Sequence, residues 1–297
     1  MKLTPHPNAS PFNLSNQAEY LRWREAKLNG YPANALQLMV EIENPAALSA
    51  QERSALLGQL HKTNMVLYRV MGKSATKDTI RQLGVQLGLH RLDGNLCADE
   101  DSITSLRVVD EGRHRGYIPY TNKPLSWHTD GYYNPLNRQV RAILMHCETP
   151  AHSGGENALL DHEILYLLLR DEDPALIYAL MHPQAMSIPP NMEGGEEIRG
   201  ETVGPVFSIM PEGHLHMRFS ARTRNITWRD DAVTQRAVVR INALLASNSP
   251  HLFRYQLQAN EGVISNNVLH NRSGFQDEGD VKRLLYRARY YDRVTEI

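Results

Sequence analysis

The sequence has few cysteines, almost no net charge and no long hydrophobic run. Two cysteines in 297 residues are too few for a disulfide scaffold or a cysteine-rich zinc module, and they suit a reducing cytoplasm. A formal net charge of −1 excludes the sequence-wide basic field that non-specific nucleic-acid binding needs. No run approaches the roughly 20 apolar residues of a membrane span, and the N-terminus lacks the apolar core of a signal peptide. We therefore expect a cytoplasmic protein that binds neither nucleic acid nor membranes.

The remaining composition is that of an ordinary globular protein. Hydrophobic residues make up 41% of the chain and charged residues 22%, which is enough to bury a large core. No compositional break divides the chain, so we expect a single domain over residues 1–297. Within it, residues 1–35 form an N-terminal arm and a helix, which Gly30 and Pro32 end.

The first hundred residues predict mainly helices. Ser49 and Glu52 have the spacing of a capping box at the start of a helix. Another helix is expected from about residue 75 to residue 89, and the segment "ALQLMVEI" is predicted to be a strand.

From residue 100 onward, short strand patterns are separated by Gly, Pro and Asn. The expected strands lie in "SITSLRVV", "VRAILMHCE", "ENALLD", "PVFSIM", "HLHMRFS", "LFRYQLQ", "GVISNNVLH" and "RLLYRARYYD". Helical patterns interrupt them at about 162–182 and in "DAVTQRAVVRINALLAS", and "SIPPNMEGGEEIRGETVG" is expected to be a long loop. The fold class is therefore α+β with a mainly antiparallel core, as in a sandwich or jelly roll.

A candidate metal site begins in the segment "KPLSWHTDGYYN". Residues i and i+2 of a strand project to the same side, so His128 and Asp130 can reach one ion. Such a His-x-Asp triplet also arises by chance in a chain with thirteen histidines. The alternative to a metal site is a turn that contains both residues and is closed by a side-chain hydrogen bond of the aspartate. The best third ligand is His270 in "VLHNR". Two histidines and a carboxylate on one face of an octahedron are the ligand set of non-haem Fe(II) oxygenases.

One further segment supports this site, and another offers a rival metal site. Arg283 opens "RLLYRARYYD", and its guanidinium offers a planar carboxylate the bidentate contact that lysine cannot match. A rival metal site is "HLHMR", where His214 and His216 share a strand face. No acidic residue at ligand spacing follows them, so we favour the first site.

These motifs together resemble the taurine dioxygenase (TauD/TfdA) family of Fe(II)/2-oxoglutarate oxygenases. The similarity covers roughly residues 60–293 and is most specific in "WHTDG", "SGGENALLD", "VLHNR" and "RLLYR". It implies a double-stranded β-helix core with flanking helices, in which His128, Asp130 and His270 bind iron. It also implies that Arg283 binds the distal carboxylate of 2-oxoglutarate. Asn157 stands where relatives usually have a Thr or Ser hydroxyl for that carboxylate; an amide can also donate.

The resemblance gives two directions for the substrate. Arg287 matches a second arginine that binds an anionic substrate group in the taurine dioxygenase pattern. Tyr120 matches an aromatic residue of the cationic cage in the γ-butyrobetaine and trimethyllysine hydroxylase branch, which "YTNKPLSWHTDGYY" and "VLHNRSGF" also resemble. Tyr132 flanks the proposed site and is a further candidate for substrate binding.

We therefore expect an enzyme that uses Fe(II), 2-oxoglutarate and O₂ to hydroxylate a C–H bond of a small anionic or zwitterionic metabolite, releasing succinate and CO₂. One alternative is that the same oxidant performs desaturation, cyclisation or C–heteroatom cleavage. An alternative of another class is a non-catalytic, cupin-like binding protein. Relatives are commonly homodimers or homotetramers, and the resemblance implies the same here.

Overall fold

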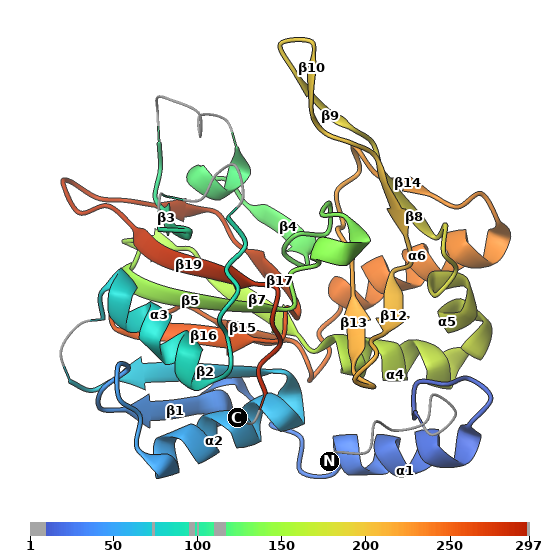
Figure 1. Ribbon diagram of the computed structural model, residues 1–297, viewed down its shortest axis with the longest axis horizontal. Coiled ribbons are helices and arrows are strands. Elements are labelled where there is room, and N and C mark those ends of the chain that lie inside the picture. The colour runs from blue at the N-terminus through green and yellow to red at the C-terminus, as the bar shows by residue number, and fades with distance from the viewer. Residues whose placement is uncertain (1–9, 73–74, 95–98, 100, 110–116, 296–297) are drawn as a thin grey trace.

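The computed structural model describes residues 10–72, 75–94, 99, 101–109 and 117–295 of the chain (Figure 1). Two sheets, one of six strands and one of four, form its centre. Helices flank these sheets, and a second group of helices and short strands lies beside them. Within the described ranges, no helix is both long enough and apolar enough to cross a membrane.

The larger sheet has the strand order β1-β2-β16-β5-β19-β3. Its neighbours pair antiparallel, except for the parallel pair β1 and β2. The bounds are β1 Met39–Ile42, β2 Met65–Val70, β3 Ile103–Leu106, β5 Ala142–Thr149, β16 Glu261–Ser265 and β19 Leu284–Tyr290.

The smaller sheet has the order β15-β7-β17-β4 and is antiparallel throughout. Its strands are β4 Leu125–His128, β7 Asn157–Leu160, β15 Phe253–Tyr255 and β17 Leu269–Arg272. Short pairs extend the core: β6 Ser153–Gly154 with β18 Phe275–Gln276, and β12 Phe207–Ile209 with β13 Leu215–Met217. Two single turns of 3₁₀ helix, η3 Ile118–Tyr120 and η4 Leu136–Arg138, flank β4 in the chain.

Alternation along the strands separates the two faces of the larger sheet. On the outer face, Tyr68 of β2 and Leu144 of β5 pack in one cluster with α2 Ala50–Thr63 and α3 Lys77–Gln86. On the inner face, Leu67 and Met145 pack against Leu159 of the smaller sheet. The space between the sheets is therefore an apolar core, and the predicted mainly antiparallel α+β arrangement is confirmed.

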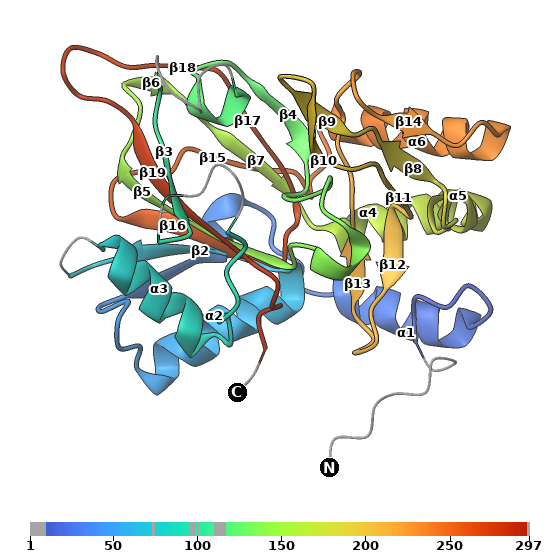
Figure 2. The same ribbon diagram turned by 45° about the horizontal axis from the view of Figure 1, so that its top comes forward.

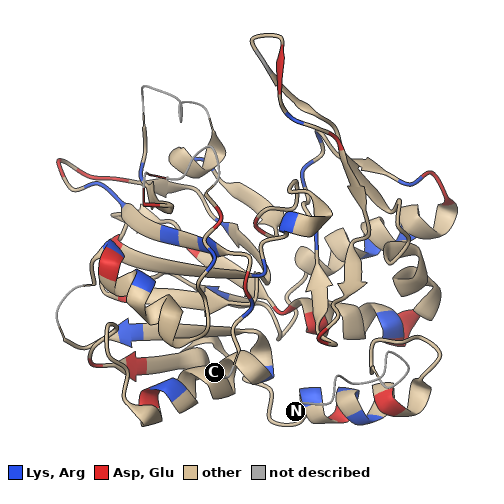
Figure 3. Cartoon of the chain, in the orientation of Figure 1, with Lys and Arg blue, Asp and Glu red and all other residues tan. Residues whose placement is uncertain are grey.

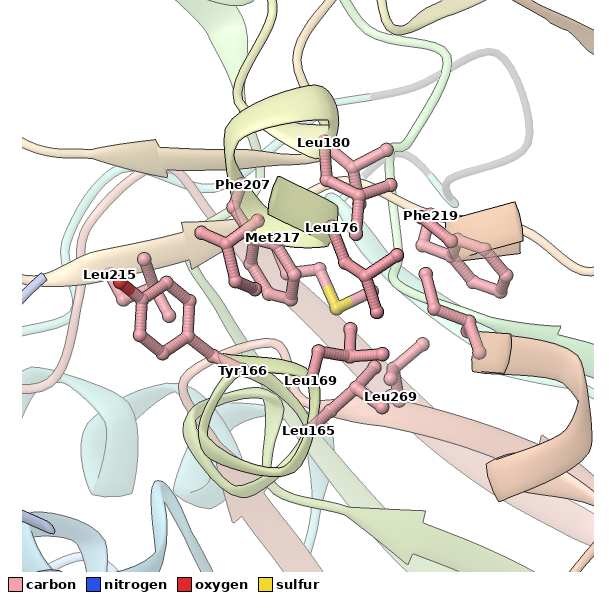
Figure 4. Close-up of a cluster of buried hydrophobic side chains, with 14 of the residues drawn as sticks. Leu165, Tyr166, Leu169, Leu176, Leu180, Phe207, Leu215, Met217, Phe219 and Leu269 are labelled. Atoms are coloured by element: carbon pink, nitrogen blue, oxygen red, sulfur yellow. The ribbon is translucent and has the colours of Figure 1, made fainter. Parts of the chain in front are cut away.

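A third apolar cluster lies beside the sheets (Figure 4). It joins α4 His162–Glu172, α5 Pro174–Leu180 and α6 Ala232–Leu245 to β12 and β13. Helix α1 Gln17–Leu28 packs on the same cluster through Tyr20. The predicted helical segment at 162–182 is thus two helices, because Asp173 ends α4 and caps α5, whose first residue is Pro174.

Two predicted elements differ from the structure. The predicted strand "ALQLMVEI" is a strand only from Met39; its first half is a 3₁₀ turn, η2 Ala35–Leu38, because the Asn34 side chain caps it by accepting from the Gln37 N–H.

The predicted long loop over residues 187–204 is also wrong, because most of it forms strands. These are β8 Met186–Ile188, β9 Asn191–Glu193, β10 Glu196–Arg199 and β11 Thr202–Gly204, with β14 Thr227–Trp228 beside β8. Gly194 and Gly195 both have positive φ, which allows the tight turn between β9 and β10. The resulting β9–β10 hairpin projects from the molecule (Figures 1 and 2).

Candidate metal centre

Three side chains, two from paired strands and one from the turn after the first of these strands, meet at one end of the smaller sheet. Strands β4 and β17 pair in a register that places His270 opposite His128, and their ring centroids are 4.3 Å apart. Asp130 follows two residues after His128. One ligand atom from each of the three residues lies within 4.8 Å of the other two, and all three residues are buried. Within the described ranges this is the one such group of three or more His, Cys, Asp or Glu residues.

The two histidine rings are held in the orientation of metal ligands. His128 Nδ1 lies 2.9 Å from the carbonyl of Ser126, and His270 Nδ1 lies 2.9 Å from the carbonyl of Val268. A carbonyl can only accept, so each Nδ1 carries the proton and each Nε2 keeps its lone pair for an ion. Burial, reinforced by the neighbouring His128, lowers the pKa of His270 to about 4. The His270 ring is therefore neutral near pH 7, as a metal ligand must be.

The third donor, Asp130, is a buried carboxylate that stays ionised. Burial alone raises its pKa, but the positive charge of Arg287, with a further contribution from Arg289, holds that pKa well below its usual value. Arg287 Nη1 lies 3.3 Å from Oδ1 and 3.3 Å from Oδ2. Oδ2 nonetheless has no hydrogen-bond partner. Two neutral imidazole nitrogens and a carboxylate with an unsatisfied oxygen are a donor set that fits Fe(II).

The backbone at Asp130 is fixed by Asn267, a residue that the sequence motifs did not single out. The Asp130 N–H donates to Asn267 Oδ1 at 2.8 Å, and Asn267 Nδ2 donates to the Asp130 carbonyl at 2.9 Å. Asn267 has a φ of 54°, a conformation that asparagine tolerates well. Gly131 has a φ of 65°, and a Cβ there would lie 2.5 Å from Cγ2 of Val140. The sequence feature that could have identified Asn267 is the pair of consecutive asparagines directly before "VLH".

A cavity between the two sheets adjoins the metal centre. His270 and Asn157 from the smaller sheet line it, together with Arg287 of β19 and Arg283, the residue directly before β19. Apolar walls are supplied by Leu106, Pro119, Leu125, Met145 and Leu285.

Arg283 is the charged group of this cavity that suits a carboxylate. It is 4% exposed, and its guanidinium has no ion-paired or hydrogen-bonded carboxylate within the described residues. Its guanidinium carbon lies 4.9 Å from the ring centroid of Phe275. Asn157 Nδ2 donates to the Asn271 carbonyl at 3.2 Å, which leaves its second N–H for a ligand. A buried unpaired cation beside an amide fits one end of a dicarboxylate such as 2-oxoglutarate.

The other predicted site residues lie in different surroundings. Tyr120 is 1% exposed and belongs to the apolar cluster between the sheets. Tyr132 is half-buried beside Asp130, with its hydroxyl 3.4 Å from Arg222 Nη1. Arg287 contacts Asp130, as described above. His214 and His216, the rival pair, are not joined by a carboxylate in a metal-binding group of the described residues.

Known proteins resemble this chain in sequence and in structure. Residues 30–289 match the family described as "Taurine catabolism dioxygenase TauD, TfdA family". A uridine-5′-phosphate dioxygenase of Streptomyces sp is 29% identical over 198 residues, covering 65% of this chain and 71% of that protein. Asparagine oxygenase, solved with Fe(II), 2S,3S-3-hydroxyasparagine and succinate, has a TM-score of 0.58 at 16% identity, covering 97% of this chain and 88% of that one.

A further solved structure has the same fold. The non-heme iron oxygenase OrfP, in complex with Fe and alpha-ketoglutaric acid, has a TM-score of 0.58 at 15% identity, covering 83% of this chain and 81% of that one. These similarities confirm the predicted jelly-roll core with flanking helices.

Proposed function

Because the chain belongs to the TauD/TfdA family and is a 2-oxoglutarate-dependent dioxygenase, we propose that His128, Asp130 and His270 bind its Fe(II) and that it hydroxylates a small anionic metabolite. The observation that carries the site assignment is the convergence of these three donors within 4.8 Å. Bound iron, 2-oxoglutarate and O₂ supply oxidative decarboxylation of 2-oxoglutarate to succinate and CO₂, coupled to oxygen insertion into a substrate C–H bond.

The residues of the chain hold and orient the reactants. The Nδ1 hydrogen bonds of His128 and His270 aim both Nε2 atoms at the same point. Arg287 keeps Asp130 ionised, so the centre retains one negative charge to offset the metal. In this proposal Arg283 binds the distal carboxylate of 2-oxoglutarate, and Asn157 donates a second hydrogen bond to it. The apolar cavity walls limit the access of water to the co-substrate.

The proposed substrate is a phosphorylated metabolite of nucleoside 5′-monophosphate type. The relative from Streptomyces acts, by its name, on uridine-5′-phosphate, and it is similar to this chain over about two thirds of either protein. Tyr132 and Tyr133, which follow Asp130 in the chain, are half-buried and present part of their ring surface. Aromatic faces suit a nucleobase, which stacks on them.

The iron assignment is tested by anaerobic titration of the protein with Fe(II) and then with 2-oxoglutarate. We expect the weak visible charge-transfer band of an iron-bound keto acid, and succinate release on exposure to air. His128→Ala or Asp130→Ala removes a donor, so both the band and succinate release are lost. The matched control is His152→Ala, an exposed histidine paired with Glu278. If both ligand variants keep the band, the metal site lies elsewhere.

The co-substrate assignment is tested by the affinity for 2-oxoglutarate. Arg283→Gln removes the buried cation, and we expect the dissociation constant measured from the visible band to rise about 10- to 100-fold. Arg254→Gln, at an exposed arginine of β15, is the control and leaves the constant unchanged. An unchanged affinity in the Arg283 variant would transfer the role to another arginine of the cavity.

A further inference from the structure

The arginines closest to the metal centre are already engaged. Arg287 faces Asp130, and Arg272 Nη2 donates to the carbonyls of Thr121 and Lys123 at 2.8 and 2.6 Å. Arg289 is paired with Asp93 and donates to the Tyr133 hydroxyl at 3.0 Å. With Arg283 assigned to the co-substrate, Arg287 and Arg289 each already face a carboxylate and Arg272 is held by backbone carbonyls; the Nε atom of each of these three arginines has no hydrogen-bond partner.

Two other arginines lie against the tyrosines that follow Asp130 and have no carboxylate partner among the described residues. Arg222 Nη1 lies 3.4 Å from the Tyr132 hydroxyl. The guanidinium carbon of Arg199 lies 5.8 Å from the ring centroid of Tyr133. Arg199 also donates to the carbonyls of Gly200 and Pro189 at 2.6 and 2.7 Å, which fixes its direction. Glu197 is the acidic group that faces Arg199, and it forms no ion pair with it.

Both arginines belong to segments that border the metal ligands. Arg222 follows Ser220, which forms a β-bridge with His128, and the Ala221 N–H donates to the Trp127 carbonyl at 2.8 Å. Arg199 ends β10, at the base of the β9–β10 hairpin; Figure 3 shows a basic stretch there, with acidic stretches both towards the tip and just below it. Strand β11, which follows the hairpin in the chain, is tied to the site because Thr202 Oγ1 donates to the Tyr133 carbonyl at 3.0 Å.

Between these arginines lie the two tyrosines that follow Asp130. Their ring centroids are 5.2 Å apart at an interplanar angle of 79°, and both residues are half-buried. Tyr132 thus meets Arg222, while Tyr133 meets both Arg199 and Arg289. The result is a rim of half-buried aromatic surface with two guanidinium groups that pair with no carboxylate of the described residues, and its tyrosines follow Asp130 by two and three residues.

We propose that Arg222 and Arg199 bind the phosphate group of the substrate at this tyrosine pair, so that the enzyme selects phosphate monoesters. A phosphate monoester carries between one and two negative charges at neutral pH and three acceptor oxygens, and two guanidinium groups can satisfy it with charge-assisted hydrogen bonds. Since Arg287 faces Asp130, this rim takes the anion in place of the second arginine of the family pattern. The inference rests on the proposed function.

The test is calorimetric titration of the anaerobic Fe(II)- and 2-oxoglutarate-loaded enzyme with uridine 5′-monophosphate, uridine and inorganic phosphate. We expect the nucleotide to bind at least tenfold more tightly than uridine. Arg222→Gln and Arg199→Gln should each weaken nucleotide binding about tenfold or more, leaving uridine binding and the visible band unchanged. Arg224→Gln, at an exposed arginine two residues away, is the matched control.

The outcomes separate this proposal from the proposed function. If nucleotide and uridine bind equally, or if neither variant changes nucleotide binding, the phosphate site is overturned while the visible band still supports a dioxygenase. If Arg287→Gln alone abolishes the preference for phosphate, the anion belongs to Arg287. If the unmodified protein shows no band with Fe(II) and 2-oxoglutarate, the proposed function itself fails.

Discussion

At the scale of single residues, Asn267 illustrates how the proposed metal centre depends on a side chain that is not one of its three ligands. Its side chain forms hydrogen bonds with both the N–H and the carbonyl of Asp130, and it donates to the Val140 carbonyl at 2.6 Å. We expect Asn267→Gly to lower the affinity for Fe(II) by about 10- to 100-fold, because the carboxylate loses its fixed position. Glycine accepts the positive φ of this residue, so backbone strain does not enter the comparison.

The measurement for this variant is anaerobic competition of Fe(II) between the protein and a chelator. Asn225→Gly is the control, since Asn225 is exposed and has a φ of 61°. Equal affinities in the unmodified protein and the Asn267 variant would mean that the two histidines alone hold Asp130 in place.

His146 makes stability depend on pH. It is fully buried, stacks on Tyr68 and lies 3.0 Å from the Tyr68 hydroxyl through Nδ1. Burial lowers its pKa from 6.5 to about 4. The unfolded chain therefore binds a proton first as pH falls, so this contribution to stability is complete above pH 6.5 and is lost between pH 6.5 and 4. The expected loss is about 2 kcal/mol by pH 5.

Urea unfolding at a series of pH values measures this effect. His146→Gln should flatten the slope of the free energy of unfolding between pH 6.5 and 5, whereas His61→Gln, at an exposed histidine, should keep it. The slopes are compared and not the absolute stabilities, because the glutamine also changes packing. An unchanged slope in the His146 variant would assign the acid sensitivity to other buried groups such as His216.

At the scale of elements, the capping box predicted for α2 is present in full. The Glu52 N–H donates to Ser49 Oγ at 3.2 Å, and the Ser49 N–H donates to Glu52 Oε2 at 2.7 Å. Ser49→Ala should lower the free energy of unfolding by about 1 kcal/mol, because one helix N–H loses its partner. Ser54→Ala, at an exposed position within the same helix, is the control and should be neutral or slightly stabilising. Equal urea midpoints for the two variants would show that water replaces the cap.

Secondary structure was predicted wrongly for residues 35–38 and 187–204, in the first case for a local reason and in the second for a non-local one. In η2 the Asn34 side chain competes with extended structure, a local effect that the apolar pattern hides. In residues 187–204 the Pro, Gly and Glu content suggested a loop, but β8 finds partners in β11 and β14. Strand formation there depends on segments distant in the chain, which composition does not reveal.

At the scale of the whole molecule, a buried ion cluster joins the N-terminal helix to the rest of the chain. Lys27 Nζ lies 2.6 Å from Asp161 Oδ2 and 2.6 Å from Glu163 Oε2, and all three residues are buried. Lys27→Met leaves two buried carboxylates without their cation, so we expect a loss of about 3–5 kcal/mol.

Chemical denaturation followed by circular dichroism measures this loss. Lys62→Met is the control: Lys62 donates to the carbonyls of Ala26 and Asn29 at the end of the same helix, but it is only partly buried. We expect that variant to lose less than about 1 kcal/mol. A similar small loss for Lys27→Met would mean that Asn64, which donates to Asp161 Oδ1 at 2.9 Å, compensates for the missing cation.

The sequence by itself determined the proposed chemistry of the site, because chemistry follows from residue type and short spacing. The proposed iron ligands and the proposed 2-oxoglutarate arginine of "RLLYR" are predicted by the motifs alone, and so are the family and the antiparallel core, which are confirmed. Only the tertiary structure decided which residues contact one another around the site. Strand register placed His270 opposite His128, strand alternation turned Arg287 towards Asp130, and core packing buried Tyr120. Such contacts join residues far apart in the chain, and no local pattern encodes which segments will pair.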